Sequence, residues 1–220
     1  GEKMFLSEYE TREFLRKHKI DVGQYVLAKT EECIEQNKTD LSFPVAMKIV
    51  SKDILHKTEA KGVILNVRSI DEAREAFNTL TKNARNYNPD AVIDGVIVTP
   101  MILGGTEVII GAKRDEQFGP VIMFGLGGIS VELFKDVVFR LAPVSLSEAT
   151  DMIKSIKSFP LINGFRGNEK VSIPMLANLI YQVSCLISKE ETLVELELNP
   201  VSCSSTECTI LDALAGFQLE

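Results

Sequence analysis

The chain has 220 residues and a formal net charge of −7, and 45% of its residues are hydrophobic. This composition is typical of a soluble globular protein, and the length allows one large domain or two smaller ones that share a core. A pI near 5.1 argues against nucleic-acid binding, which usually needs a basic face. It does not argue against binding a nucleotide, because a phosphate group needs only a few local cations.

Hydropathy argues against contact with a membrane. No apolar run approaches the roughly 20 residues that a spanning helix needs. The opening stretch GEKMFLSEYE also lacks the charged-then-apolar layout of a secretory signal, so we expect a cytoplasmic protein. The cysteines form no C-x-x-C pair and no zinc-site spacing, which favours free thiols in a reducing compartment. Cys203 and Cys208 are nevertheless close enough in sequence to bridge across a turn.

Strands and helices alternate along the first half of the chain. Ser7-Glu8-Tyr9-Glu10 and Ser69-Ile70-Asp71-Glu72 have the Ser-x-x-Glu pattern of a capping box, which predicts helices running to about His18 and Tyr87. A further helical piece is expected from Thr30. Apolar and β-branched runs predict strands over residues 25–28, 44–50, 62–67 and 95–101.

The second half is richer in predicted strands. They cover residues 107–112, 121–124, 137–141, 193–198 and 209–213, with a loop over 114–120. Ser145-Leu146-Ser147-Glu148 is a third capping box, opening a helix to about Ser158, and another helix is expected over 174–188. We therefore expect an α/β (α+β) chain with an antiparallel middle and an antiparallel final pair. A change in the pattern of elements near residue 95 predicts two lobes, over residues 1–94 and 95–220.

Lys48 is predicted in the middle of a buried strand, on the face opposite Val45, Met47 and Ile49. Burying an ammonium group without a partner costs several kcal/mol, so an anion should meet it. A salt bridge to a carboxylate, or a position at an exposed edge, would be a structural explanation. A nucleotide phosphate would be a functional one, and the spacing alone does not choose between them.

The run FGLGG at 124–128 follows a predicted strand. Glycines let backbone N–H groups approach a phosphate closely, but a tight turn explains such a run equally simply. It completes neither G-x-x-x-x-G-K-[ST] nor G-x-G-x-x-G.

The C-terminal pair of strands places oxygen-bearing side chains together. Glu195, Glu197 and Asn199 share one face of LVELELNP, and Asp212 follows the turn. If the strands pair as a hairpin, Asn199 and Asp212 lie side by side. Two hard oxygen ligands plus phosphate oxygens are typical of Mg²⁺ in nucleotide enzymes, although one solvated strand face would also account for the pattern.

His56 is one of only two histidines, and it stands between lysines in KDILHKT at 52–58. It is either an ordinary loop residue in a charge-crowded position or the place where a phosphoryl group arrives. An imidazole with its ordinary pKa of about 6.5 is largely neutral and nucleophilic at cellular pH. Neighbouring ammonium groups would attract a dianionic phosphoryl group, and phosphoryl transfer asks mainly for positioning and charge neutralisation.

Three blocks of sequence together resemble the ATP-grasp subunit or domain of ADP-forming (NDP-forming) acyl-CoA synthetases of the acetate–CoA ligase type. They are FPVAMKIVSKDILHKTEAKGV at 43–63, FGPVIMFGLGGISVELFKDVVFRLAP at 118–143, and ELELNPV at 195–201 followed by LDA at 211–213. The resemblance runs from about Phe5 to Phe217. It implies an ATP-grasp fold, with two lobes, a hinge between them near residues 95–101, and the nucleotide between the lobes.

The resemblance also implies roles for individual residues. Lys48 would contact the nucleotide phosphates, His56 would be phosphorylated in transit, and Glu197 would steady an incoming phosphohistidine. Asn199 and Asp212 would bind Mg²⁺. The remaining nucleotide-binding residues would be Val98, Thr99, Pro100, Met101 and Glu107. Pro100 and Lys61 depart from the family pattern, which often has an acidic residue and a glycine there.

The implied reaction is acyl-CoA + ADP + phosphate ⇌ acid + CoA + ATP, by way of an acyl phosphate and phosphohistidine. CoA binding and the first phosphohistidine would belong to a separate α subunit or a fused domain, so the chain would catalyse the complete ligase reaction only with that CoA-binding partner. Two alternatives stay open: a non-catalytic regulatory ATP-grasp module of an acetyltransferase-type fusion, and another ATP-grasp carboxylate ligase. The second would phosphorylate its acid directly and would not need His56.

Overall fold

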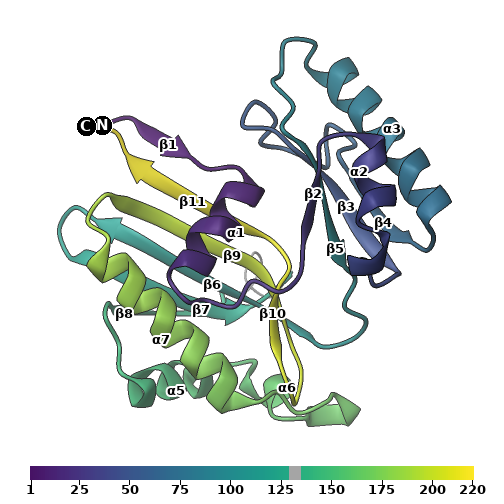
Figure 1. Ribbon diagram of the computed structural model, residues 1–220. Coiled ribbons are helices and arrows are strands. Elements are labelled where there is room, and N and C mark those ends of the chain that lie inside the picture. Colours follow the sequence, from purple (N-terminus) through teal and green to yellow (C-terminus); the bar gives the residue numbers. More distant parts are fainter. Residues whose placement is uncertain (129–134) are drawn as a thin grey trace. The chain divides into compact units, whose positions relative to one another are not determined.

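The computed structural model describes residues 1–128 and 135–220, and it divides into two compact units (Figure 1). The smaller unit is Gly23–Met101. The larger unit combines Gly1–Val22 with Ile102–Glu220. None of the helices in the described ranges is both long and apolar enough to cross a membrane.

This division differs at both ends from the lobes expected over 1–94 and 95–220. Strand β1 (Lys3–Phe5) pairs antiparallel with β11 (Ala213–Gln218), and helix α1 (Glu8–Lys17) packs on β11. The start of the chain therefore belongs to the C-terminal sheet. Strand β5 (Gly95–Pro100) pairs with strands of the smaller unit, so the segment expected to be a hinge is part of a sheet.

The smaller unit is a four-stranded antiparallel sheet covered by helices. The strand order is β2 (Val26–Ala28), β5, β3 (Val45–Val50) and β4 (Val63–Val67). The helices are α2 (Glu31–Gln36) and α3 (Ile70–Tyr87), with a short 3₁₀ turn at Lys38–Asp40. The apolar face of α3 packs against β3, β4 and β5, and the core contains Val45, Met47, Ile49, Ala73, Phe77, Leu80, Ala84 and Val98.

The larger unit is built on a seven-stranded sheet, ordered β1-β11-β9-β6-β7-β8, with β10 also pairing with β9. Its other strands are β6 (Thr106–Asp115), β7 (Gly119–Leu126), β8 (Val137–Leu141), β9 (Leu193–Cys203) and β10 (Cys208–Ile210). The helices are α5 (Leu146–Ser155), α6 (Phe159–Ile162) and α7 (Ile173–Lys189), with a 3₁₀ turn at Phe165–Gly167. Helix α7 packs on β6, β7 and β9, and α5 packs on α7 (Figure 1).

The predicted α/β (α+β) architecture, with helices packed on antiparallel sheets, is confirmed. Capping boxes close the N-termini of α1 and α5, as the sequence predicts. At α3 the Ser69 hydroxyl accepts from the Glu72 N–H, but the Glu72 carboxylate accepts from the Arg68 N–H instead of the Ser69 N–H. The capping box predicted at Ser69 is therefore half formed.

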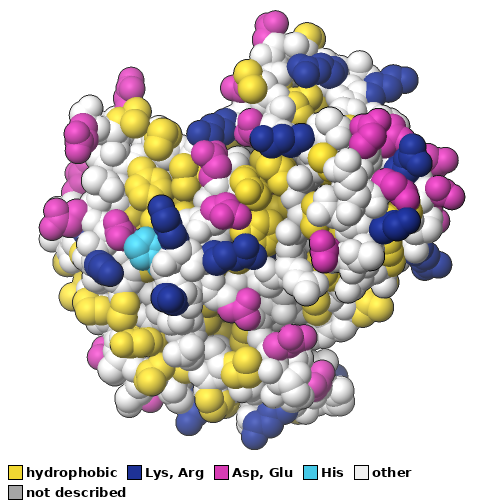
Figure 2. All heavy atoms as spheres, in the orientation of Figure 1, with side chains coloured by type: hydrophobic (Ala, Val, Ile, Leu, Met, Phe, Trp, Pro, Cys, Tyr) yellow, Lys and Arg dark blue, Asp and Glu magenta, His cyan; other side chains and the backbone are white. Residues whose placement is uncertain are grey.

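The loop expected over 114–120 is mostly strand. Strand β6 continues to Asp115 and β7 begins at Gly119, because the two strands pair up to the turn, with Asp115 opposite Gly119. The Arg114 side chain donates to the backbone carbonyls of Ile187, Glu190 and Leu193. Acidic and basic side chains are interspersed over the face of the molecule seen in Figure 2, with apolar side chains between them.

Candidate functional site

Glu197, Asn199 and Asp212 lie together where β9 meets the start of β11. The Asn199 N–H donates to the Asp212 carbonyl at 3.1 Å, so the predicted side-by-side placement of these two residues is confirmed. The Asn199 side-chain amide donates to Glu197 Oε1 at 3.1 Å. Glu197 lies between Gly111 on β6 and Leu214 on β11, and Gly111 contributes no side chain to cover it.

The donor atoms of this group suit a hard divalent cation. With its amide nitrogen turned toward Glu197, the Asn199 side chain presents its oxygen elsewhere, and Asp212 Oδ1 accepts from the Ala213 N–H at 2.8 Å. No group of three or more histidine, cysteine or acidic residues able to hold a metal occurs within residues 1–128 and 135–220. An ion here would therefore take the rest of its ligands from bound nucleotide and water, which is the usual arrangement for Mg²⁺.

Glu107 lies beside the glycine run that follows β7. The Gly127 N–H donates to the Glu107 carbonyl at 2.8 Å. A Cβ at position 127 would lie 3.0 Å from that carbonyl oxygen, so the close approach of the chains favours glycine there. Gly128 has φ +78°, a conformation that also favours glycine. The next residues of the block, 129–134, lie outside the described ranges.

Lys48 occupies the expected place in mid-strand and is 7% exposed. It pairs with Ile97 of β5 on one side and with Val63 of β4 on the other. Met47 and Ile49 point into the helix-covered core, so Lys48 lies on the opposite face, as the sequence predicts. Thr99 shares the Lys48 face, because it pairs with Ala46 two residues along.

The other residues expected to contact the nucleotide differ in whether their side chains are accessible. The Val98 side chain is 1% exposed and belongs to the helix-covered core. Pro100 pairs with Val45 at the end of β5, and the Met101 N–H donates to the Pro44 carbonyl at 3.0 Å. Only the backbone of Val98 is therefore open to a role in binding.

His56 lies on the connection between β3 and β4, which is anchored at both ends. The Ser51 hydroxyl donates to the Val92 carbonyl at 2.7 Å, and the Val92 N–H donates to Asp53 Oδ2 at 2.7 Å. Ile54 and Ala60, on either side of His56, are buried members of the core. His56 itself is exposed. The loop thus presents an imidazole to solvent while fixing the chain beneath it.

Comparison with known proteins agrees with these features. A family model described as an ATP-grasp domain matches residues 1–215. The β subunit of ADP-forming acetate–CoA ligase I from Pyrococcus furiosus is 44% identical over 208 residues, covering 94% of this chain and 90% of that one.

The chain belongs to the ATP-grasp family, in the group of ADP-forming acid–CoA ligases.

Solved structures place this ATP-grasp chain in the same group. Acetyl-coenzyme A synthetase 1 of Ca. Korarchaeum cryptofilum, in complex with coenzyme A and Ca-AMPCP, has a TM-score of 0.93 and 39% identity, covering 97% of this chain and 93% of that one. The same enzyme with coenzyme A and Mg-AMPPCP has its phosphohistidine segment pointing towards the nucleotide-binding site. That structure has a TM-score of 0.84 and 36% identity, with the same coverage.

The cysteines of this ATP-grasp chain are free thiols. Cys203 and Cys208 lie directly opposite each other across the β9–β10 hairpin. A hydrogen bond between the two thiols, together with burial, raises the pKa of Cys203, and the same hydrogen bond lowers the pKa of Cys208. Cys203 and Cys208 are therefore neighbours, as their spacing allows, but they are free thiols and form no disulfide.

One feature of this ATP-grasp chain, a buried charge pair on α1, could not be predicted from the sequence. Glu8 and Arg12 form a buried ion pair on α1, with Oε2 and Nε 3.2 Å apart and side-chain exposures of 1% and 2%. Their i,i+4 spacing is readable in the sequence, but it is typical of solvent-exposed helix pairs as well. The sequence contains no sign that this pair lies under the C-terminal sheet.

Proposed function

We propose that this chain is the nucleotide-binding, phosphoryl-relay component of an ADP-forming acid–CoA ligase. The reaction would be acyl-CoA + ADP + phosphate ⇌ acid + CoA + ATP. The observation that carries the proposal is the 44% identity to an ADP-forming acetate–CoA ligase β subunit over almost the whole of both chains. The residues that the chemistry requires are present along the same length.

In this proposal His56 is the residue that carries the phosphoryl group. Its ring is exposed on an anchored loop, so it can meet a phosphoryl donor without the loop unfolding. In the ATP-forming direction the phosphorus–nitrogen bond of phosphohistidine breaks and the β-phosphate oxygen of ADP forms the new bond to phosphorus. A phosphorylated ring nitrogen is a good leaving group, so the step runs in either direction.

Lys48 is proposed to neutralise the nucleotide phosphates. Phosphoryl transfer depends mainly on positioning and on charge stabilisation, and a buried ammonium group supplies both without reorganisation. Thr99, Pro100 and Met101, with the backbone of Val98, are proposed to contact the base. Glu107, beside the glycine run, is proposed as a further nucleotide-binding residue.

Asn199 and Asp212 are proposed to hold Mg²⁺ together with phosphate oxygens. When bound, Mg²⁺ neutralises charge on the transferring phosphoryl group. Glu197 is held next to Asn199 by a hydrogen bond at 3.1 Å and is proposed to steady an incoming phosphohistidine by accepting a hydrogen bond from its ring. The carboxylate is intermediate in exposure, which suits a residue that meets a mobile partner.

The partner is proposed to be a CoA-binding α subunit or fused domain that carries the first phosphohistidine. Support comes from the β-subunit naming of the Pyrococcus relative and from the phosphohistidine segment of the Korarchaeum enzyme. We also propose a cytoplasmic location, where the free thiols found in the structure are stable.

Exchange of label between ADP and ATP tests this function without the partner. Transfer of the terminal phosphoryl group to His56 and back converts labelled ADP into labelled ATP in the presence of Mg²⁺ and unlabelled ATP. We expect exchange with the wild-type chain and none with His56→Ala, while His18→Ala, which changes the other histidine, exchanges normally.

The same assay separates the alternatives. A non-catalytic regulatory module would give no exchange with either protein. A carboxylate ligase that phosphorylates its acid directly would exchange only after the acid is added, and it would do so equally with His56→Ala. Either result would contradict the proposed relay.

A further inference from the structure

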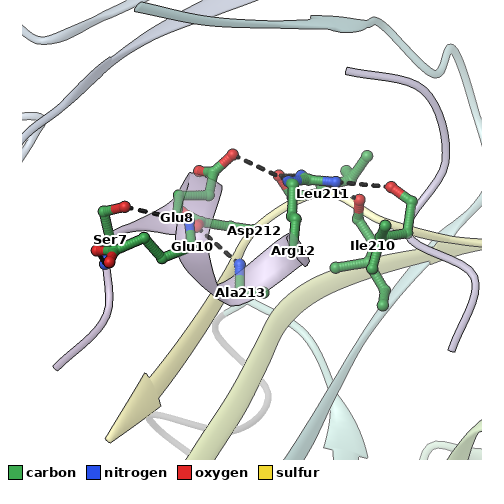
Figure 3. Close-up of polar contacts among 9 residues, drawn as sticks. Ser7, Glu8, Glu10, Arg12, Ile210, Leu211, Asp212 and Ala213 are labelled. Atoms are coloured by element: carbon green, nitrogen blue, oxygen red, sulfur yellow. Dashed lines mark hydrogen bonds and ion pairs between the residues drawn. The ribbon is translucent and has the colours of Figure 1, made fainter. Parts of the chain in front are cut away.

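Arg12 is a buried cation whose hydrogen bonds converge on the segment that precedes Asp212. Its guanidinium donates to the carbonyls of Ile210 at 3.3 Å and Leu211 at 3.1 Å (Figure 3). It also donates to the Val22 carbonyl at 2.8 Å. Only a forked, multiply donating group can satisfy carbonyls on two chain segments while keeping one donor for a carboxylate.

Glu8 fixes the guanidinium from the same helix. The two side chains are one turn apart on α1, and both are almost fully buried. A capping box of Ser7 and Glu10 fixes the N-terminus of this helix (Figure 3). A buried ion pair is poor evidence for stability, because desolvation offsets most of the attraction between the charges. The hydrogen bonds from Arg12 to the main chain at Ile210 and Leu211 suggest that the pair fixes the position of this segment.

Helix α1 also holds the chain on the far side of Asp212. The Ala215 N–H donates to the Thr11 hydroxyl at 3.2 Å. The Asp212 carbonyl accepts from Asn199 and the Asp212 carboxylate accepts from the Ala213 N–H. Neighbouring side chains of α1, Thr11 and Arg12, thus hold the main chain before and after the acidic residue.

We propose that Arg12, held in place by Glu8, is a positioning residue that orients Asp212 and its neighbour Asn199 toward the divalent ion of the nucleotide. The inference rests on the proposed function, in which these two residues hold that ion. Mg²⁺ demands near-octahedral geometry, so a small rotation of the segment 210–212 would weaken it more than it would weaken the nucleotide alone. Groups that orient metal ligands typically change metal affinity 10- to 100-fold when mutated.

The test measures ADP affinity by calorimetry on the full chain, with Mg²⁺ and with a chelator. The ratio of the two affinities is the metal-dependent gain. For Arg12→Lys we expect this gain to fall by about tenfold, while the affinity for metal-free ADP stays at the wild-type value. A residue that only stabilises the fold would lower the melting temperature and leave the gain unchanged.

Arg114→Lys is the matched control. Arg114 also donates to three backbone carbonyls in the larger unit, but these belong to Ile187, Glu190 and Leu193, at the end of α7 and the start of β9. We expect the control to keep the full metal-dependent gain. Equal gains for Arg12→Lys, Arg114→Lys and wild type would overturn the inference.

Two further variants keep the outcomes distinct. Asp212→Asn tests the proposed metal ligand itself: if its gain equals that of the wild type, the ligand assignment fails. If Asp212→Asn loses the gain and Arg12→Lys does not, only the positioning role fails. If Arg12→Lys does not fold, Glu8→Gln replaces it, and an unchanged gain in that variant would equally overturn the inference.

Discussion

Lys48 combines deep burial with a positive charge. Its side chain lies in the middle of β3, on the sheet face opposite the hydrophobic core of the smaller unit. The free energy of keeping an ammonium group there is unfavourable unless an anion compensates it. A charge in such a position makes Lys48 a candidate for contact with an anionic ligand, and the proposed function supplies the phosphates of ATP.

Replacing Lys48 by methionine tests this role. Methionine keeps a similar length and removes the charge, so we expect ADP affinity to fall at least tenfold, about 1.4 kcal/mol. Lys82→Met, on the exposed side of α3, is the control and should bind normally. Calorimetric titration with Mg·ADP gives the comparison, and wild-type affinity in the Lys48 variant would refute the assignment.

At this scale the sequence predicted local relations better than distant ones. The faces of β3 and the closeness of Asn199 and Asp212 followed from strand periodicity and a short turn. The Arg12 contacts could not be predicted in that way. They join residues separated by nearly 200 positions, and no local pattern encodes which carbonyls a buried guanidinium will meet.

The connection between β3 and β4 is the element on which the relay depends. Gly62 closes this loop, and its N–H donates to the Lys57 carbonyl at 2.7 Å. A Cβ there would lie 2.6 Å from Ile49 Cγ2, a side chain fixed in the core. Lys61, next to it, has φ 54°, a left-handed conformation that costs a residue with a side chain roughly 1–2 kcal/mol.

Two neighbouring substitutions in this loop are therefore expected to differ in their effect on ADP–ATP exchange. Gly62→Ala should displace the loop and slow ADP–ATP exchange at least tenfold, because His56 would no longer be presented correctly. Lys61→Gly should leave ADP–ATP exchange intact, since glycine adopts this conformation freely. It should change the free energy of unfolding by between zero and an increase of about 1 kcal/mol. Thermal unfolding and exchange rates measure both effects. A Gly62→Ala protein with normal exchange would show that the anchoring is unimportant.

Strand β1 and the second half of β9 show which parts of the fold could not be predicted from the sequence. The short strand β1 exists only because it pairs with β11 at the other end of the chain, and three residues carry no periodic signal. Strand β9 continues beyond the predicted end at Leu198. Pro200 is accommodated where the pairing with β6 shifts register, between Val108 and Ile110.

Across the whole molecule, the chain enters the larger unit, leaves it for the smaller one and returns. All members of the smaller unit's core lie between residues 23 and 101, so this unit carries its own packing. The larger unit depends on both ends of the sequence, since β1 and α1 cover β11. The change in the pattern of elements near residue 95 did not predict that the N-terminal segment belongs to the larger unit. Strands that pair across a long stretch of sequence produce no local sequence pattern.

Fragments of the chain test this division. We expect residues 23–101 alone to unfold in one cooperative thermal transition. Residues 102–220 without the first 22 should lack such a transition, because β11 would lose β1 and the Arg12 hydrogen bonds. Adding residues 1–22 back through a linker should restore it. A cooperative transition in 102–220 alone, monitored by circular dichroism, would show that the N-terminal segment is dispensable.

The central claim is that His56 carries a phosphoryl group between the nucleotide and the partner. Incubation of the full chain with Mg²⁺ and ATP labelled at the terminal phosphate tests it most directly. We expect label that is labile to acid and stable to base, located on His56 by mass spectrometry and absent from His56→Ala. Equal acid-labile labelling of the His56→Ala protein would contradict the claim.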